Sequence, residues 1–505
     1  MTVISKVFFQ PLDRVAIALM LLLSLLMGLL LLPGDAVAPR VRDFSWQNKK
    51  IGVEDTSFTL TFTRPMDIKS VEENLQIDPP LPGKVSWAGR RMAYTVLTPA
   101  PYGTSYQVQL NGARDSLTSG AGNLIQPFRG SFRSRDRAFV YLGVEAEEQG
   151  RLILYNLTQQ QKTILTPKHL VVVEFKPYPV GEKILFSATE RTSNRPGLLS
   201  SALYTVTTGI GQGNQAPDDS NGFLRPTAET NAPSGKIELV LDSKDYQNLK
   251  FDLAADGQTI VVQRVSQRNP GEFGLWILRP NTEPQPLKTE QGGDFMITPD
   301  SAAVAVAQGQ GVAILPLQSE AEKPLDFLPQ FGMVLDFAPN GTEAAMVRFN
   351  SDYTRSLFLV TTQGVQKELL RTTGSILSCQ FAPRAQLYCL LTQLLGGEEY
   401  QEQPYLAVID LKTGNQKPLV LLPNQRDVQM SLSPDGLGLL FDQVVTVTSG
   451  SNPSQVNAPR TDEGEAIATS RLWLLPLISA FEERSPTQLQ PEQLPLPGVH
   501  PRWLP

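Results

Sequence analysis

The phrase Phe337-Ala338-Pro339-Asn340-Gly341 recurs, with variation, along the C-terminal two-thirds of the chain. An apolar residue is followed by any residue, then by proline, then by a turn. The anchor prolines or their equivalents stand at 177, 255, 299, 339, 383 and 434. A period of about 40–45 residues with β-type sequence around each copy is typical of a β-propeller with one copy per blade. The other copies are Ile297-Thr298-Pro299-Asp300-Ser301, Phe381-Ala382-Pro383-Arg384, Leu432-Ser433-Pro434-Asp435-Gly436, Phe175-Lys176-Pro177 and Leu253-Ala254-Ala255-Asp256-Gly257.

The strand that leads into each anchor alternates apolar and mostly polar residues, which is the period of a β-strand. Before Pro339, for example, Leu335 and Phe337 are apolar and Asp336 lies between them. We therefore expect four-stranded blades with the anchor strand innermost. The polar residues are expected to hydrogen-bond between blades, and the alternative is that they line the mouth of the central channel. These candidate site residues are Glu174, Asp252, Asp336, Gln380 and Arg502.

Seven sets of outer strands accompany only six internal anchors. The unmatched set comes first, at 138–143, 151–157 and 162–165. The C-terminal residues 499–505 can supply the missing inner strand of this first blade. Trp503 stands two residues before Pro505, as the apolar residue does before each anchor, and Arg502 takes the polar position. The sequence thus predicts a seven-bladed propeller over 137–505 that is closed by its own C-terminus. Two Gly-, Asn- and Pro-rich stretches, 209–235 and 449–468, are expected to be flexible insertions.

Residues 39–134 lack the repeat and carry short alternating runs such as Ser57–Phe62, bounded by turn clusters, which indicates a β-sandwich. The stretch resembles a bacterial Ig-like domain of the S-layer-associated type, through Phe62-Thr63-Arg64-Pro65-Met66-Asp67, Ile77-Asp78-Pro79-Pro80, Trp87 and Tyr102-Gly103-Thr104-Ser105-Tyr106. The resemblance implies a spacer or adhesive module without catalytic residues. Phe62, Trp87, Tyr106 and Phe132 are interpreted as core, and Asp67 as a turn or capping residue.

The propeller part resembles TolB-like proteins, whose repeats carry a Pro-Asp-Gly turn after the inner strand. Pro434-Asp435-Gly436 is the best copy of that turn. The chain differs from TolB in carrying an Ig-like domain where TolB has an α/β domain. The partners of TolB are therefore not carried over. The fold class expected overall is all-β, an Ig-like sandwich followed by a propeller, with one N-terminal helix.

That helix is expected over 15–32, where an apolar run follows Lys6 and Arg14. A run of about 18 residues is long enough to span a bilayer, which predicts a transmembrane anchor behind a short cytoplasmic N-terminus, 1–14. The alternative is a cleaved signal peptide with Ala36-Val37-Ala38 before the cut. Either interpretation places the body outside the cytoplasm, in the periplasm or at the cell surface.

The two cysteines, Cys379 and Cys389, occupy positions that are apolar in other copies, so we interpret them as small core residues. A cross-strand disulfide is the alternative, since an exported body meets an oxidising compartment.

Little in the sequence indicates chemistry. The chain has two histidines, net charge −6, no Gly-x-Ser-x-Gly elbow and no phosphate-binding loop. We therefore expect no catalytic, cofactor-binding or metal site, and no nucleic-acid partner. The acidic clusters Glu145–Glu148 and Glu398–Glu402 are interpreted as solvated loops rather than Ca²⁺ sites, and His500 as structural.

Several connections between second and third blade strands are long, and in a propeller they emerge on one face. That face is the predicted partner surface, because loops on a rigid scaffold commonly carry binding. The sequence favours a non-enzymatic binding or scaffold protein of the bacterial cell envelope with a protein or glycan partner. Two alternatives stay open: an enzyme acting on glycan or peptide at that face, and a passive surface-layer or adhesive component. The long connections are Val144–Gly150, Thr189–Ser200, Ser266–Phe273, Leu394–Pro404 and Ser449–Ala468.

Overall fold

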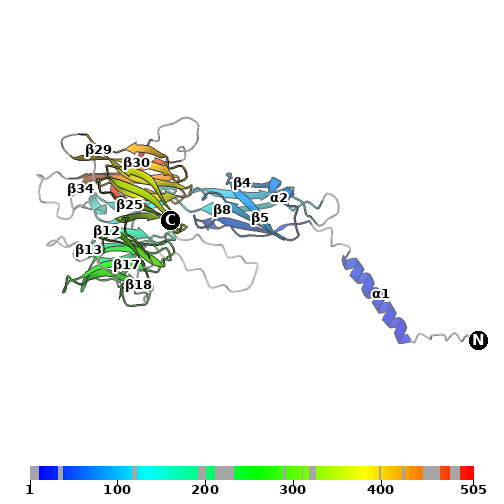
Figure 1. The fold of residues 1–505 in the computed structure, drawn as a ribbon. Helices are drawn as coiled ribbons and strands as arrows, with labels where there is room; N and C mark the ends of the chain where they lie inside the picture. The colour runs from blue at the N-terminus through cyan, green and yellow to red at the C-terminus, as the bar shows by residue number, and fades with distance from the viewer. Residues whose placement is uncertain are drawn as a thin grey trace, which may run out of the picture. The chain divides into compact units, whose positions relative to one another are not determined.

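The chain falls into two compact units, which Figure 1 draws in the computed structural model. One unit is Met1–Leu97 with Ser105–Arg133, and the other is Thr98–Thr104 with Ser134–Pro505. In the described part of the chain, the elements are two α-helices, a short 3₁₀ turn, and strands in four-stranded antiparallel sheets. The structure describes residues 11–31, 38–116, 122–191, 201–210, 233–287, 292–309, 311–317, 326–396, 400–422, 427–446, 467–477 and 490–505.

The N-terminal helix is α1, Pro11–Leu31. Nowhere in the described part of the chain does a helix combine the length and the apolar character that crossing a membrane requires. The transmembrane anchor predicted over 15–32 is therefore not supported by the structure.

The first unit contains a sandwich of two sheets, as the alternating runs predict. Figure 1 shows β4, β5, β8 and α2 together in this body. Phe62, Tyr106 and Phe132 are buried core residues, as predicted. Trp87 is only half-buried, because its ring stacks on Phe62 from the sheet surface and its indole N–H donates to Glu72. The first sheet has the order β1 (Val41–Phe44), β3 (Ser57–Phe62), β6 (Arg91–Val96), β5 (Gly83–Ala88), and the second β2 (Lys50–Ile51), β8 (Phe128–Ser134), β7 (Ser105–Leu110), β4 (Leu75–Asp78).

Asp67 is a capping residue, which confirms its predicted role. It precedes α2 (Ile68–Asn74), and its carboxylate accepts the Ser70 N–H at 2.8 Å. That bond satisfies a backbone donor that the helix itself cannot pair.

The second unit contains seven four-stranded sheets, which we call blades 1 to 7 (Figure 1). In blades 2 to 7 the strands follow one another in sequence, with the anchor strand at one edge. Blade 1 is β36 (Gly498–Trp503), β9 (Ala138–Gly143), β10 (Leu152–Asn156) and β11 (Gln161–Ile164); blade 2 is β12 (Leu170–Pro177), β13 (Lys183–Glu190), β14 (Ala202–Thr207) and β15 (Ile237–Leu241); blade 3 is β16 (Tyr246–Leu253), β17 (Ile260–Ser266), β18 (Phe273–Leu278) and β19 (Gln285–Pro286); blade 4 is β20 (Phe295–Ile297), β21 (Ala303–Gln308), β22 (Gly311–Pro316) and β23 (Asp326–Leu328); blade 5 is β24 (Met333–Phe337), β25 (Glu343–Phe349), β26 (Arg355–Thr361) and β27 (Gln366–Thr372); blade 6 is β28 (Ile376–Ala382), β29 (Gln386–Leu395), β30 (Gln401–Asp410) and β31 (Gln416–Leu421); blade 7 is β32 (Met430–Leu432), β33 (Gly438–Thr446), β34 (Ile467–Pro476) and β35 (Glu492–Gln493).

Each blade packs on both neighbours through its own apolar core, so the ring is closed. Seven buried clusters each bridge one pair of adjacent blades, and the last of them joins blade 7 to blade 1. That cluster holds Leu440 and Leu472 of blade 7 against Phe139, Tyr141 and Trp503 of blade 1. The predicted seven-blade count is therefore what the structure contains.

The C-terminal strand β36 completes blade 1, as the surplus set of outer strands predicts. Val499 pairs with Leu142 and Trp503 with Phe139, and a bulge at His500 and Pro501 separates these pairs. His500 takes a positive φ of 54° in that bulge. The strand thus joins the two ends of the propeller sequence in one sheet.

At four junctions the turn after an inner strand packs on the turn region of the preceding blade. Gly436 follows anchor Pro434 with φ +70°, and a Cβ added there would lie 3.0 Å from Cδ of Pro383, the anchor of blade 6. A side chain is therefore disfavoured by both backbone conformation and space. The same neighbour relation joins Gly181 to Pro505, Gly257 to Pro179, and Gly341 to Pro299.

The two predicted insertions, 209–235 and 449–468, lie largely outside the described residues. Only their ends, 209–210, 233–235 and 467–468, belong to the described part of the chain.

Removing the Trp503 side chain should destabilise the whole propeller. The ring is 7% exposed and contacts Phe139 edge-on at 5.5 Å, so Trp503→Ala empties the core between blades 7 and 1. We expect a loss of roughly 3–5 kcal/mol in the free energy of unfolding, measured by denaturant titration of the full chain. Arg502→Ala, at the exposed neighbouring position, is the matched control and should unfold like the parent. Equal midpoints for the two variants would show that the C-terminus does not close the ring.

Candidate functional site

The predicted inner polar positions lie along the innermost strands, and three of them bond to the next blade. Asp252 accepts the Ile297 N–H at 2.8 Å, and Asp336 accepts the Phe381 N–H at 2.9 Å. Gln380 accepts the Leu432 N–H at 2.6 Å. Each donor stands two residues before the anchor of its blade. An inner strand has no strand partner on its channel side, so these side chains satisfy backbone donors that would otherwise stay unpaired.

The other two predicted residues differ. Glu174 of blade 2 is half-buried, and Arg502 on β36 is exposed. An acceptor that the prediction did not include is Ser431, whose hydroxyl accepts the Trp503 N–H at 3.1 Å. The inner strands of blades 2 and 3 are joined by an ion pair between Lys176 and Asp252. The structure therefore brings Asp252, Asp336 and Gln380 into equivalent roles and gives Glu174 and Arg502 different surroundings.

A buried carboxylate, Asp442 on β33, holds the closing strand. One oxygen accepts the Gln429 N–H at 2.7 Å, and the other accepts the His500 N–H at 2.7 Å. Burial raises the pKa of Asp442 to about 7, although the two N–H donors act in the opposite direction. Burial likewise raises the pKa of Asp336 to about 7. Both carboxylates are placed by backbone donors, and His500 takes part in closing the ring through its own N–H.

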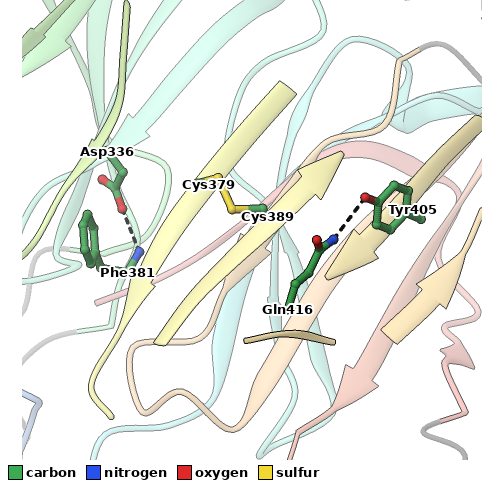
Figure 2. The surroundings of a disulfide bond; sticks show 6 residues. All are labelled: Asp336, Cys379, Phe381, Cys389, Tyr405 and Gln416. Carbon is green, nitrogen blue, oxygen red and sulfur yellow. Dashed lines mark hydrogen bonds between the residues drawn. A yellow bond between two sulfur atoms is a disulfide. The ribbon is translucent and has the colours of Figure 1, made fainter. Parts of the chain in front are cut away.

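Cys379 and Cys389 form a disulfide across β28 and β29, which corrects the preferred interpretation of two unpaired core residues. They are directly opposite in the register, with Cα atoms 4.1 Å apart. Both are buried, at 2% and 0% exposure, so a core position and a disulfide are compatible here. Figure 2 shows this bond beside the hydrogen bond from Phe381 to Asp336.

The acidic cluster Glu145–Glu148 is divided among separate cations. Glu145 pairs with Arg471 at 3.0 Å, and Glu147 and Glu148 pair with Lys168 and Lys162. In the second cluster, Glu398 lies outside the described residues. Glu402 accepts hydrogen bonds from the Tyr400 and Thr392 hydroxyls. Among the residues that the structure describes, no group of His, Cys, Asp and Glu could hold a metal ion.

Connections between second and third strands emerge at one end of the blades, because consecutive strands are antiparallel; we call this end the loop face. The opposite end, with the anchor turns, is the turn face. Three aromatic side chains stand out on the loop face of blades 5 and 6. Tyr353 is 92% exposed, Tyr400 69% and Phe349 58%. We call Phe349, Tyr353 and Tyr400 the aromatic patch.

The loop that carries Tyr353 is held in one conformation by its neighbours. Asn350 N–H donates to the Thr354 carbonyl at 2.9 Å, and Asp352 accepts from the Thr354 hydroxyl at 2.6 Å. Arg371 pairs with Asp352 at 2.5 Å. Tyr353 takes a positive φ of 64° at the tip of this loop. The ring is therefore presented outward by a loop whose own polar groups are already satisfied.

Tyr400 is positioned by a network on blade 6. Its phenol donates to Glu402, which also accepts the Thr392 hydroxyl at 2.5 Å. The bond to Glu402 raises the pKa of Tyr400, and the Arg355 guanidinium acts in the opposite direction. Arg355 itself donates to the Gly374 carbonyl at 2.9 Å. Arg355 follows Tyr353 by two residues and interacts with Tyr400, so it connects the blade 5 and blade 6 parts of the patch.

Sequence reasoning did not identify the aromatic patch. The prediction chose the longest connections, and the Tyr353 loop between β25 and β26 is short. Leu394–Pro404, which does contain Tyr400, was among the predicted loops. The usable signal was an aromatic residue among turn-forming ones, in Asn350-Ser351-Asp352-Tyr353-Thr354.

Comparison with known proteins identifies one part of the chain. Residues 35–134 match the family model of the bacterial Ig-like domain. This agrees with the resemblance drawn from the sequence over 39–134, so the sandwich of the first unit is a bacterial Ig-like domain. No curated protein matches the chain.

Solved structures share the architecture distantly. TolB from Acinetobacter baumannii is 12% identical, with TM-score 0.38, over 70% of this chain and 80% of that one. A putative TolB from Agrobacterium tumefaciens is 12% identical, with TM-score 0.35, over 57% and 90%. An oligogalacturonate lyase from Vibrio parahaemolyticus is 12% identical, with TM-score 0.40, over 61% and 87%. Similarity at this level says nothing about the activity of this chain.

The raised pKa of Asp442 and Asp336 predicts that stability falls as pH rises. An unfolded aspartate has a pKa of about 3.9, so between about pH 4 and 7 the folded state binds more protons than the unfolded state. The unfolding midpoint should be higher at pH 5 than at pH 8. Asp442→Asn should flatten this slope whatever its effect on the midpoint itself. Asp410→Asn, at the end of β30, should leave the slope between pH 5 and 8 unchanged, because hydrogen bonds from Thr413 lower the pKa of Asp410. A parent whose stability rises from pH 5 to 8 would contradict the assignment.

The disulfide predicts that the folded protein contains no reactive thiol. Chain purified without reductant and then denatured should give no thiol reaction, and two thiols after reduction, one from each cysteine. The double variant Cys379→Ala/Cys389→Ala should lose about 2–4 kcal/mol of stability, because the cross-link no longer restricts the unfolded chain. Two free thiols before reduction would restore the interpretation of unpaired core residues.

Proposed function

We propose that this protein is a non-enzymatic binding or scaffold protein of the bacterial cell envelope, and that it holds a protein partner on the loop face of its propeller. Three observations support the compartment. An apolar run follows Lys6 and Arg14, the bacterial Ig-like domain comes next, and the propeller contains a disulfide. Disulfides persist mainly in oxidising compartments outside the cytoplasm.

The aromatic patch is the observation that carries the proposal. Exposed aromatic residues leave apolar area in contact with water. Burying that area against a partner would stabilise the complex by about 25 cal/mol per Å². Tyrosine and arginine are also the residues enriched at the energetic centres of protein interfaces. Arg355 adjoins the aromatic patch, because it follows Tyr353 by two residues and its guanidinium interacts with Tyr400. The Tyr353 loop is held by internal hydrogen bonds and the Tyr400 phenol by Glu402, so these groups would lose little conformational entropy on binding.

Catalysis at the propeller is the main alternative, and a converging pair of free carboxylates would favour it. In this ring both Asp252 and Asp336 accept hydrogen bonds from backbone N–H groups, which gives each a structural task. A passive role through the Ig-like domain is the third possibility. In that case the aromatic patch would not contact a partner. Substitutions in the patch therefore distinguish the passive role from partner binding by the propeller.

Partner capture from crosslinked cell envelopes tests the proposal. The affinity-tagged full chain should recover a defined protein, and Tyr353→Ser/Tyr400→Ser should reduce that recovery about tenfold or more, because central aromatic contacts dominate interface energy. The matched control is Val365→Ser. Val365 is 58% exposed in the turn between β26 and β27, on the turn face. Both variants should melt like the parent.

Two results would count against the proposal. Equal recovery by the double variant and the parent would exclude the aromatic patch as the contact surface. Recovery that is lost only when the Ig-like domain is altered would favour the passive adhesive role. A glycan partner would appear as capture that survives protease treatment and disappears after deglycosylation.

A further inference from the structure

Arg264 is a buried cation that lies against two aromatic rings of blade 3, which contact each other edge to face with centroids 5.0 Å apart. Its guanidinium lies 4.5 Å from the ring centroid of Tyr246 and 5.2 Å from that of Trp276. The residue is only 6% exposed, and both aromatic residues are half-buried. Strand β17 carries Arg264 near its end at the loop face, and Tyr246 begins β16 at the same end. Both rings thus contribute a cation–π contact to the guanidinium.

One edge of the guanidinium is anchored within the protein. Its Nε donates to Oδ1 of Asn248 at 3.1 Å. The Asn248 amide in turn donates to the carbonyls of Ser201 at 2.9 Å and Asp242 at 3.1 Å. Asn248 is therefore fixed by blade 2 and by the connection between the blades. This arrangement sets the direction in which the rest of Arg264 points.

The two terminal nitrogens of Arg264 have no hydrogen bond or ion pair with any residue in the described part of the chain. These nitrogens are not among the fully buried polar atoms that lack a hydrogen-bond partner in the described part of the chain, so they are accessible from solvent. Burial lowers the pKa of Arg264. The nearby acidic residues do not supply the missing partner, because Asp242 pairs with Lys244 at 3.4 Å and Asp245 with Arg268 at 3.1 Å.

Open space adjoins Arg264 on the neighbouring strand. Arg264 pairs directly with Gly274 of β18, so their Cα substituents would project from the same face of the sheet. A Cβ added at Gly274 would meet no atom within 4 Å. The missing side chain thus leaves a notch next to the guanidinium.

We propose that this notch is a carboxylate-binding site, in which the terminal nitrogens of Arg264 pair with a carboxylate that enters over Gly274. The terminal N–H groups of a planar guanidinium match a carboxylate in bidentate geometry. Burial lowers the pKa of Arg264, and the nearby negative charges of Asp242 and Asp245 act in the opposite direction; those charges repel a phosphate dianion more strongly than a carboxylate monoanion. The occupant is a peptide carboxylate of the loop-face partner. That assignment rests on the proposed function, while binding of the carboxylate itself does not.

Small probes test the site without the partner. The full chain is labelled with 5-fluorotryptophan, and the Trp276 signal is assigned from Trp276→Phe. N-acetylglycine represents a C-terminal carboxylate and N-acetylaspartate amide represents a side chain. At least one should shift the Trp276 signal saturably at concentrations on the order of millimolar, and N-acetylglycinamide should not. The stronger probe distinguishes a terminal from a side-chain carboxylate.

Two variants locate the binding. Gly274→Val fills the notch while keeping Arg264, and Arg264→Lys keeps the charge but removes the planar fork, so each should weaken the probe about tenfold or more. Arg268→Lys is the control, since the Arg268 side chain is 87% exposed. The proposal is overturned if no carboxylate shifts Trp276, if the amide probe acts equally, or if both notch variants bind like the parent. Failure of partner capture through the aromatic patch would leave these titrations unaffected, so the two proposals fail separately.

Discussion

A hydrogen bond from the backbone of one inner strand to a side chain on the preceding inner strand ties neighbouring blades together. The inner strand of a blade is a sheet edge, and half of its N–H groups face no strand. Asp252, Asp336, Gln380 and Ser431 each accept one such N–H, at 2.8, 2.9, 2.6 and 3.1 Å. Unpaired buried donors cost about 1–3 kcal/mol each. The apolar inter-blade cores can therefore form only with the blades in a register that satisfies these donors.

Ring closure depends on the same interaction at its last junction. Ser431 accepts the N–H of Trp503, and Asp442 accepts that of His500, so both side chains of blade 7 hold the strand that belongs to blade 1. The hydroxyl of Ser470 adds a bond to the Gly498 carbonyl at 2.6 Å. A C-terminal strand held only by sheet pairing would fray readily. Here it is fixed from two blades at once.

Most of the architecture could be predicted from the sequence because it repeats. The recurring proline phrase gave the period, and the alternation around Asp336 and Gln380 gave the strand and its polar position. The glycine of the phrase has a physical reason in Gly436, where a positive φ and a 3.0 Å approach to Pro383 disfavour a side chain. Trp503 could be placed in the closing strand because it stands where Phe337 and Phe381 stand in other blades.

Features that occur once could not be predicted in this way. Cys379 sits at an ordinary apolar position, and only the hairpin register places it opposite Cys389. The aromatic patch depends on the exposure of Tyr353 and Tyr400, which composition does not reveal. In the sequence, Arg264 is one polar residue in an apolar strand. Its contacts with Tyr246 and Trp276 arise only when three strands of blade 3 come together. The candidate functional surfaces are thus the places where the chain departs from its own repeat, which is where function is expected on a repeated scaffold.

Amide hydrogen exchange at the four bonded inner-strand N–H groups tests this account most directly. If the blades form one closed ring, the amides of Ile297, Phe381, Leu432 and Trp503 should exchange slowly and at similar rates, because each opens only when the ring unfolds. Exchange of Trp503 that is orders of magnitude faster than that of Phe381 would contradict the account. It would mean that the C-terminal strand opens on its own and that the ring does not depend on it.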